Sequence, residues 1–214
     1  MNGYFLTATG TDIGKTFTSC ALLHADPTFR AIKPVISGFD GEQTDTHQLH
    51  AAMNKRSSIE SISPWRYRAP LAPDRAAARE GSVLPYQQML DWCHSELSKP
   101  GTTLIEGVGG IMAPLDNRHT VLDWAQALNI PLLLVAGSYL GTISHTLTAL
   151  QVIAQRGLTV RAIVVNESEE SPMTLEELAL SMQPHIGEGL LRMQPRVSSY
   201  REATVIHALA KELQ

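Results

Sequence analysis

The N-terminal segment constrains the fold of this 214-residue chain more than any other feature. Residues 4–7 form an apolar run that predicts a buried strand, small residues follow as a loop, and Gly14, Lys15 and Thr16 open an amphipathic helix. In that order, backbone N–H groups of the loop and of the helix N-terminus can surround phosphate oxygens, Lys15 can reach them, and the Thr16 hydroxyl can bind a magnesium ion. The strict motif has glycine where this chain has Thr9, and an ordinary strand–helix turn is the alternative. The position directly after a strand favours a phosphate site.

Apolar runs continue to alternate with segments of helical spacing, which is the pattern of βα units on a parallel sheet. Strands are expected over residues 4–7, 31–35, 102–105, 131–135, 162–165 and 190–193. Helices are expected over residues 15–24, 46–53, 85–98, 121–128, 143–155, 175–182 and 202–212, with Thr174 and Glu177 as a capping box. Residues 57–73, rich in proline, are expected as a surface loop. The pattern predicts one α/β domain over residues 1–214, a P-loop NTPase-like three-layer fold whose mostly parallel central sheet is flanked by helices.

Charge and composition narrow the classes of partner. The formal net charge is −4 with both signs mixed along the chain, so neither nucleic acid nor a membrane is an expected partner. The longest apolar runs are too short to span a bilayer, and no signal-peptide pattern opens the chain, which favours a cytoplasmic protein that acts on small molecules. Cys20 and Cys93 are expected as buried apolar residues rather than as a disulfide or metal ligands. His47 and His50 are expected on a solvated helix face.

Two acidic residues are candidates for the magnesium-bound nucleotide. Glu106 ends an apolar run and precedes a glycine-rich loop, residues 107–110, whose backbone can approach phosphate or substrate. Asp45 is less clear, because it can equally be the N-cap of the helix that follows it.

A lysine in an apolar strand is a further candidate. Lys33 lies near the end of the second expected strand, where a cation must reach a pocket or find an anion, and the phosphate site provides one. The alternative is an edge-strand lysine in water, with which Pro34 is compatible. Ser37, which precedes Gly38, has two possible roles: it contacts the substrate, or it is an ordinary turn residue.

Taken together, these residues resemble the dethiobiotin synthetase family. The resemblance covers nearly the whole chain and rests on Gly14-Lys15-Thr16, Lys33-Pro34-Val35 with Ser37-Gly38, Glu106-Gly107-Val108-Gly109-Gly110 and Val164-Val165-Asn166. It implies an ATP- and magnesium-dependent enzyme that joins carbon dioxide to 7,8-diaminononanoate (diaminopelargonate) as a carbamate, phosphorylates the carbamate, and closes a ureido ring to give dethiobiotin, ADP and phosphate. It also implies a homodimer with active sites at the interface.

The resemblance also assigns roles to residues. The catalytic residues that it implies are Lys33, Lys15 and Thr11. The magnesium ligands that it implies are Thr16, Asp45 and Glu106. The nucleotide contacts that it implies are Asp12, Ile13, Gly14, Lys15, Thr16, Phe17, Asp45, Glu106, Gly107, Val108, Gly109, Asn166, which reads adenine, and Glu167. The substrate contacts that it implies are Ser37 and, for the far carboxylate, Gly141, Thr142, Ile143 and Ser144 from the other subunit. A helix beginning near Thr142 agrees with that last assignment, since its free N–H groups favour an anion.

Three positions depart from the family pattern and two other classes compete with it. Ala8 stands where glycine is common, Asp74 where histidine is expected, and Gly187-Glu188 has no following proline. Partition and septum-placing ATPases share this kind of fold as nucleotide switches, but their loop carries an additional lysine where this chain has Gly10. Cobyrinate-type amidotransferases also phosphorylate a carboxyl group, but they continue into a glutaminase domain, which is not expected here.

Overall fold

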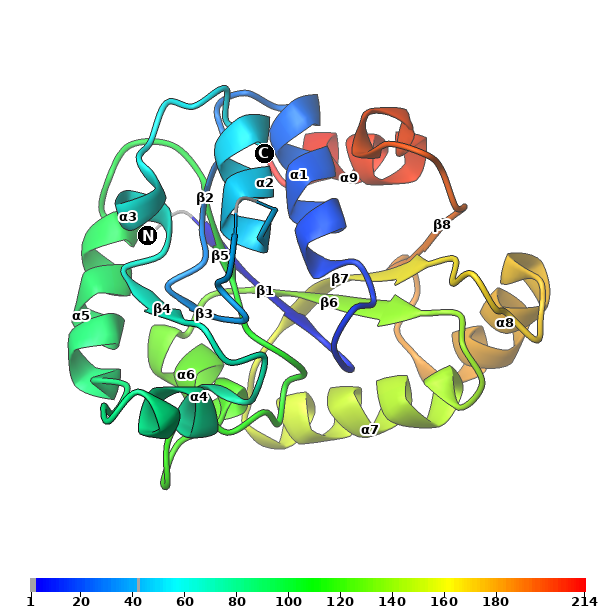
Figure 1. The fold of residues 1–214 in the computed structure, drawn as a ribbon. Coiled ribbons are helices and arrows are strands. Elements are labelled where there is room, and N and C mark those ends of the chain that lie inside the picture. Colours follow the sequence, from blue (N-terminus) through cyan, green and yellow to red (C-terminus); the bar gives the residue numbers. More distant parts are fainter. Residues whose placement is uncertain (1–2, 42) are drawn as a thin grey trace.

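A parallel sheet forms the centre of the molecule in the computed structural model, which describes residues 3–41 and 43–214. Within these residues, six strands are hydrogen-bonded in the order β2-β5-β1-β6-β7-β8, each parallel to its neighbours (Figure 1). Their bounds are β1 Gly3–Ala8, β2 Arg30–Ile32, β5 Thr103–Glu106, β6 Leu132–Gly137, β7 Val160–Asn166 and β8 Leu191–Gln194. The expected α/β class is confirmed, and β1 lies inside the sheet with its carboxyl end between those of β5 and β6.

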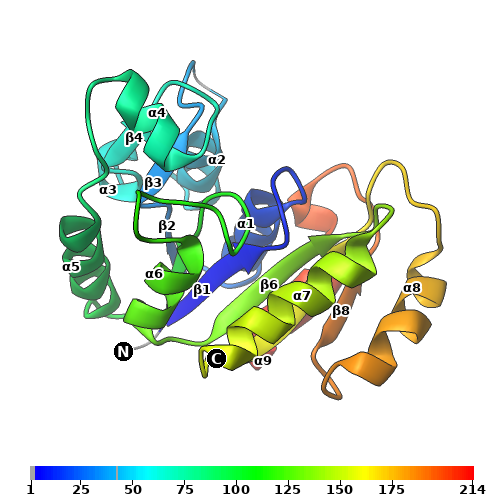
Figure 2. The same cartoon turned by 90° about the horizontal axis from the view of Figure 1, so that it is seen from below.

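Helices cover both faces of this sheet (Figures 1 and 2). One face packs against α1 Lys15–Ala25, α2 Asp45–Ala52 and α9 Thr204–Glu212. The other packs against α5 Tyr86–Leu97, α6 Val121–Leu128, α7 Thr142–Gln155 and α8 Leu175–Met182. The helix α4, Pro73–Arg79, lies beside the short strands over residues 35–37 and 65–67. Along β6, Leu132 and Leu134 join one core cluster while Leu133 and Val135 join the other. The strand is apolar throughout because both of its faces are buried, so the three layers follow from the sequence pattern.

The second expected strand is interrupted at Lys33 and Pro34. After β2 ends, β3 pairs with β4 in a separate parallel pair, whose bounds are Val35–Ser37 and Trp65–Tyr67. Proline has no N–H to donate to a neighbouring strand, so the ladder stops there. The Lys33 N–H donates instead to the Ile62 carbonyl at 2.9 Å. The prediction of one continuous strand is wrong, and the break sets Lys33 at the carboxyl end of β2.

The segment expected as a surface loop, residues 57–73, contains regular structure. The short helix α3 (Ile59–Ile62) starts after Ser58, whose hydroxyl accepts from the Ser61 N–H at 3.2 Å, and β4 follows it. α4 begins at Pro73, where a helix tolerates proline because the first-turn N–H groups have no helical partner. The loop prediction is therefore wrong for these elements, although the residues 70–73 that enter α4 do line a cleft.

Capping decides several helix ends. The predicted capping box of α8 is confirmed: the Thr174 hydroxyl accepts from the Glu177 N–H at 3.2 Å, and a Glu177 carboxylate oxygen accepts from the Thr174 N–H at 2.9 Å. The 3-10 turn η1 (Gln183–His185) continues that helix, and another, η2 (Tyr200–Glu202), precedes α9. The last helix thus starts later than predicted.

Both cysteines are buried free thiols, as predicted. Burial raises the pKa of Cys93 to about 12 and raises that of Cys20 further, so neither is a thiolate near neutral pH. Across residues 3–41 and 43–214, none of the helices has the length and apolar character needed to cross a bilayer.

Candidate active site

A cleft of about 1070 Å³ collects residues from segments that are far apart in the sequence. It lies where the loop after β1, the start of α1 and the loop after β5 meet. Of the predicted residues, its walls include Thr11, Asp12, Gly14, Lys15, Thr16, Phe17, Lys33, Ser37, Asp45, Val108 and Gly109. Ligand clefts of parallel α/β sheets lie at this carboxyl edge, so the motifs converge where a phosphate site belongs.

The first turn of α1 is open toward the cleft. Gly14 stands at the N-cap with φ 91° and ψ 29°, a left-handed conformation that glycine adopts without strain. Among the described residues no side chain caps this end, and the first turn carries no acidic residue. The free N–H groups and the positive end of the helix dipole therefore remain available to an anion.

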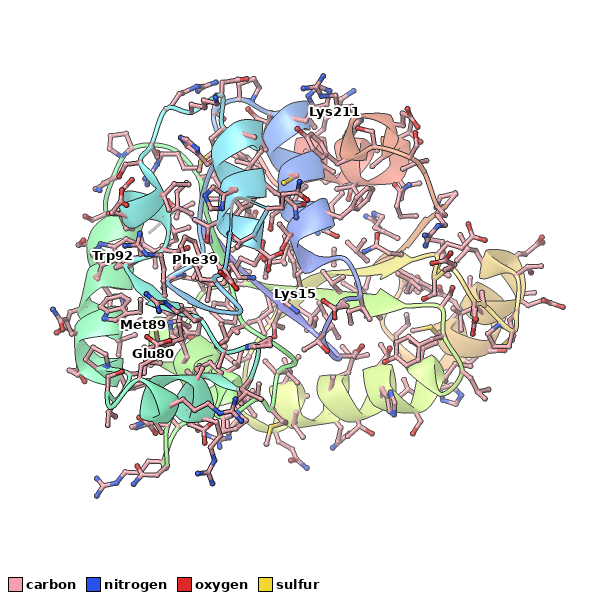
Figure 3. The ribbon with its side chains drawn as sticks, in the orientation of Figure 1. Lys15, Phe39, Glu80, Met89, Trp92 and Lys211 are labelled. Atoms are coloured by element: carbon pink, nitrogen blue, oxygen red, sulfur yellow. The ribbon has the colours of Figure 1, made fainter. Side chains whose placement is uncertain are left out.

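Lys15 extends from this turn over the loop, and Figure 3 shows it at the base of α1. Its Nζ donates to the Gly10 carbonyl at 3.1 Å, and the residue is 7% exposed. Burial, followed by the positive charge of Lys33, lowers the pKa of Lys15 from 10.5 to about 8. The buried Lys15 ammonium makes no ion pair with the residues that the structure describes, so it favours binding of an anion. A bound anion would raise the pKa of Lys15 toward its ordinary value.

Glu106 lies buried behind the wall of the cleft and ties three of its neighbours together. This carboxylate is 0% exposed and accepts three hydrogen bonds, from the Thr16 hydroxyl at 2.7 Å, the Ser19 hydroxyl at 2.6 Å and the Lys33 ammonium at 2.8 Å. A buried carboxylate needs this degree of satisfaction. Sequence reasoning missed Ser19. The available signal was its spacing, because a residue three positions after Thr16 lies on the same helix face.

Lys33 bridges two acids. Its Nζ lies 2.6 Å from Asp45 Oδ2 and 2.8 Å from Glu106 Oε1, and the residue is 2% exposed. Burial, the largest influence, lowers the pKa of Lys33, but Glu106 and Asp45 together outweigh it and hold the pKa above its usual value. The alternative of a solvated edge lysine is therefore wrong, and Lys33 is a permanent cation.

Asp45 is the more accessible of the two acids, with its side chain 40% exposed. Burial raises the pKa of Asp45, but the charge of Lys33 and its hydrogen bond to Asp45 outweigh burial and hold the pKa below its usual value. The N-cap position of α2 belongs to Thr44, so the N-cap interpretation of Asp45 is wrong. Its carboxylate instead faces the cleft beside the phosphate loop.

The oxygens of Thr16, Asp45 and Glu106 suit a magnesium ion, which prefers hard oxygen donors. Thr16 Oγ1 donates to Glu106 and keeps lone pairs for a cation, and the exposed Asp45 carboxylate can take a second position. In the part of the chain that the structure describes, no group of at least three His, Cys, Asp or Glu residues could hold a metal alone. This donor set fits an ion that shares its coordination with phosphate oxygens and water.

The glycine-rich loop after β5 packs on the phosphate loop itself. The Gly107 N–H donates to Leu6 O at 2.8 Å and the Ile111 N–H to Ala8 O at 2.8 Å. A Cβ on Gly110 would lie 3.3 Å from the Gly10 backbone nitrogen. Because the glycines have no side chains, the backbone of the loop after β5 can contact the backbone of the loop after β1. Together the two backbones form one wall of the cleft.

The predicted substrate residues divide into two groups. Ser37 lines the cleft, and its Oγ is buried without a hydrogen-bond partner among the described residues. Gly141, Thr142, Ile143 and Ser144 do not line the cleft of their own chain. Thr142 is committed elsewhere, since its hydroxyl donates to Gly137 O at 2.6 Å. Further along α7, His145 and Thr148 line the cleft in their place.

A second cleft, of about 450 Å³, opens on the other side of the α1 N-terminus. Its walls include predicted nucleotide contacts, namely Asp12, Ile13, Gly14, Phe17, Asn166 and Glu167. The Asn166 Nδ2 donates to Ile13 O at 3.1 Å and to Thr18 Oγ1 at 3.3 Å, which ties β7 to the phosphate loop.

The remaining wall of this second cleft was not foreseen. It is formed by Ser168 and Glu169 after β7 and by Gln194, Pro195, Arg196 and Val197 at and after the end of β8. Gly187 and Glu188, where a proline was sought, line neither cleft. Of the other departures, Asp74 lies in the first turn of α4 and Ala8 is fully buried at the end of β1.

Gly14 has no room for a side chain, and this gives a first prediction. A Cβ there would lie 2.4 Å from Asn166 Nδ2 at a positive φ. Gly14→Ala is expected to lower the free energy of unfolding by about 2 kcal/mol. Thermal unfolding of the ligand-free protein measures this. Gly10→Ala is the control, since its Cβ would meet no atom within 4 Å. Equal unfolding temperatures for the two variants would contradict the assigned contact.

Comparisons with known proteins agree with this site. Residues 2–207 match the family described as an AAA domain. The ATP-dependent dethiobiotin synthetase of Caulobacter vibrioides is 41% identical over 218 residues, covering 98% of this chain and 99% of the relative. That of Acidiphilium cryptum is 41% identical over 199 residues, covering 87% and 89%.

Solved structures show the fold. A ParA family ATPase from Chlorobium tepidum superposes with a TM-score of 0.59 at 13% identity, covering 100% of this chain and 98% of that one. The septum site-determining protein MinD of Pyrococcus horikoshii, complexed with Mg-ADP, superposes with a TM-score of 0.57 at 14% identity, covering 99% and 96%. At this identity, the likeness concerns architecture alone.

The fold and the open first turn of α1 define a P-loop nucleotide-binding protein with a mostly parallel sheet. Within that class, the sequence relationship is specific. The chain belongs to the dethiobiotin synthetase family.

Proposed function

We propose that this chain is an ATP-dependent cyclo-ligase that converts 7,8-diaminononanoate and carbon dioxide into dethiobiotin, with ATP split to ADP and phosphate. The observation that carries the proposal is the buried cation Lys33, held by Asp45 and Glu106 at a P-loop cleft in a chain that is 41% identical to named dethiobiotin synthetases. The switch alternative of the partition and septum-placing ATPases is not favoured, because Gly10 stands where their additional lysine is expected.

The reaction joins two anions before it closes a ring. One amine of the substrate attacks carbon dioxide and loses a proton, forming an N–C bond and a carbamate. A carbamate oxygen then attacks the γ-phosphorus of ATP, and the bond to ADP breaks. The second amine attacks the carbonyl carbon of this carbamic-phosphoric anhydride, phosphate leaves, and the amine proton is lost to give the ureido ring.

Two lysines of the chain offset the repulsion between the carbamate and the ATP phosphates. We assign Lys15 to the ATP phosphates and Lys33 to the carbamate and the transferred phosphoryl group, where positive charge stabilises the transition state. Because its pKa is raised, Lys33 acts as a fixed charge and not as a proton acceptor. Thr11 and Ser37 are assigned to the substrate, and the free Ser37 hydroxyl supports that role.

We assign Thr16, Asp45 and Glu106 to the Mg²⁺ site. Glu106 also positions the Thr16 hydroxyl, from which it accepts a hydrogen bond. When bound, magnesium neutralises charge on the β- and γ-phosphates. Asn166 is assigned to adenine, with residues 12–17, 107–109 and 167 completing the nucleotide contacts.

The remaining assignments concern assembly. We propose that residues 1–214 act as one synthetase domain in the cytoplasm and that the enzyme is a homodimer. Residues 141–144 lie outside the cleft of their own chain but at the start of α7, which supports their delivery to the active site of a partner subunit.

Incubation with 7,8-diaminononanoate, bicarbonate, magnesium and ATP is expected to give dethiobiotin and ADP in equal amounts, measured by mass spectrometry and by ADP release. Omitting the diamine is expected to stop ADP release. ATP turnover that continues at the same rate without the diamine would contradict the synthetase and favour a nucleotide switch.

A further inference from the structure

Two carboxamide side chains lie side by side in the second cleft. Asn166 ends β7, Gln194 ends β8, and the two are register partners in this parallel pair. Partner residues on neighbouring parallel strands point to the same face of a sheet. Both residues line the 450 Å³ cleft, together with the apolar side chains of Ile13, Phe17 and Val197. Charged residues line other parts of the same cleft, namely Asp12, Glu167, Glu169 and Arg196.

Each of these amides has a free oxygen. Asn166 Oδ1 and Gln194 Oε1 are buried and have no hydrogen-bond partner among the described residues, and Gln194 is only 2% exposed. Buried polar atoms normally have a hydrogen-bond partner. Two unpaired amide oxygens at one cleft therefore indicate that a bound molecule supplies the donor.

The nitrogen atoms fix which way each amide faces. Asn166 Nδ2 donates to Ile13 O at 3.1 Å, and Gln194 Nε2 donates to Pro195 O at 2.6 Å. Turning either amide over would place its oxygen against a carbonyl oxygen, which repels it. The two free groups are therefore both acceptors.

Two acceptors beside apolar walls suit a planar group that carries two donor hydrogens. The exocyclic amino group of adenine or cytosine is such a group, whereas guanine and uracil present a carbonyl oxygen at the corresponding position. A carbonyl oxygen would meet two acceptors and leave all three unsatisfied.

We propose that Gln194 is a specificity-determining residue, which accepts a hydrogen bond from the nucleobase amino group next to Asn166 and thereby selects amino-bearing bases. This inference rests on the nucleotide-binding part of the proposed function. Asn166 follows from the family resemblance, but Gln194 follows from the strand register and its unpaired oxygen alone.

Replacing Gln194 with leucine tests the role, because leucine fills similar space and has no acceptor. In the full-length protein, Gln194→Leu is expected to weaken ADP binding about tenfold and leave GDP binding unchanged, so that the ADP-to-GDP ratio falls by about that factor. Calorimetric titration with ADP and GDP measures both. At saturating ATP, the turnover number should stay near that of the parent while the KM for ATP rises.

The control is Gln183→Leu, the same substitution on the exposed turn η1, and it is expected to leave the ratio unchanged. An unaltered ADP-to-GDP ratio in a folded Gln194→Leu variant would overturn the inference, as would a parent protein without preference for ADP over GDP. If the parent prefers ADP, loses that preference on Gln194→Leu, yet forms no dethiobiotin, then the proposed function fails and the inference stands.

Discussion

Replacing Lys33 with methionine is expected to reduce dethiobiotin formation by roughly 10³-fold or more, while ADP binding in the absence of magnesium changes only a few-fold. The reason is the position of the charge. Lys33 is held by Asp45 and Glu106, and its Nζ shares Glu106 Oε1 with the Thr16 hydroxyl of the first turn of α1. It therefore lies beside the turn that we assign to phosphate without being part of it, and we assign its charge to the second reactant. Turnover is measured as dethiobiotin formed per unit time, and binding by calorimetry.

Stability must be separated from chemistry in this experiment. Without Lys33, two acids face each other with Glu106 at 0% exposure, and such a loss typically costs about 3–5 kcal/mol. The double variant Lys33→Met with Glu106→Gln removes the buried stranded charge and is expected to recover stability but not ring closure. Lys211→Met, on α9, is the exposed control (Figure 3). Normal turnover in the folded double variant would remove Lys33 from its assigned role.

The sequence contained enough to predict the layers and the phosphate loop. Strands that are buried on both faces read as unbroken apolar runs, and β6 illustrates this because it is buried along its whole length. The Gly14-Lys15-Thr16 turn was predictable for another reason: its function needs particular residues in consecutive positions, so the local sequence carries the geometry.

Contacts between distant segments were harder to predict. Ser19 reads as an ordinary helix residue until Glu106, which precedes a different loop, is placed beneath it. The interruption at Pro34 was visible in the sequence, but its consequence, the pairing of β3 with β4, depends on a partner in a proline-rich segment. Strand pairing across such separations is decided by tertiary packing, which local patterns do not encode.

The second cleft was also harder to predict than the phosphate loop. Asn166 is identified through the family resemblance, which rests in part on Val164-Val165-Asn166 at the end of β7. The end of β8, a short and only partly buried strand, carries no such motif. Gln194 acquires significance only through its register with Asn166. A single sequence shows the residue but not its neighbour.

Replacing Lys15 with methionine is expected to weaken nucleotide binding by at least roughly 10²-fold and, unlike the change at Lys33, to stabilise the ligand-free protein. Lys15 makes no ion pair among the described residues, since its Nζ donates only to the Gly10 carbonyl. The folded state instead opposes its charge, lowering its pKa from 10.5 to about 8, mainly through burial. At pH 7 the unfolded chain therefore holds this proton more strongly than the folded chain, so that the charge destabilises folding by roughly 3 kcal/mol.

The sign of this effect also sets its pH dependence. The stability gain of Lys15→Met should be fully present below pH 8, decline as the pH rises, and vanish above about 10.5, where Lys15 is neutral in both states. Urea unfolding at several pH values measures the gain, and ADP titration at pH 7 measures the loss of binding. Lys211→Met should change neither. A variant that is less stable than the parent at pH 7 would contradict the destabilising charge of Lys15. A variant that binds ADP normally would contradict its assignment to the phosphates.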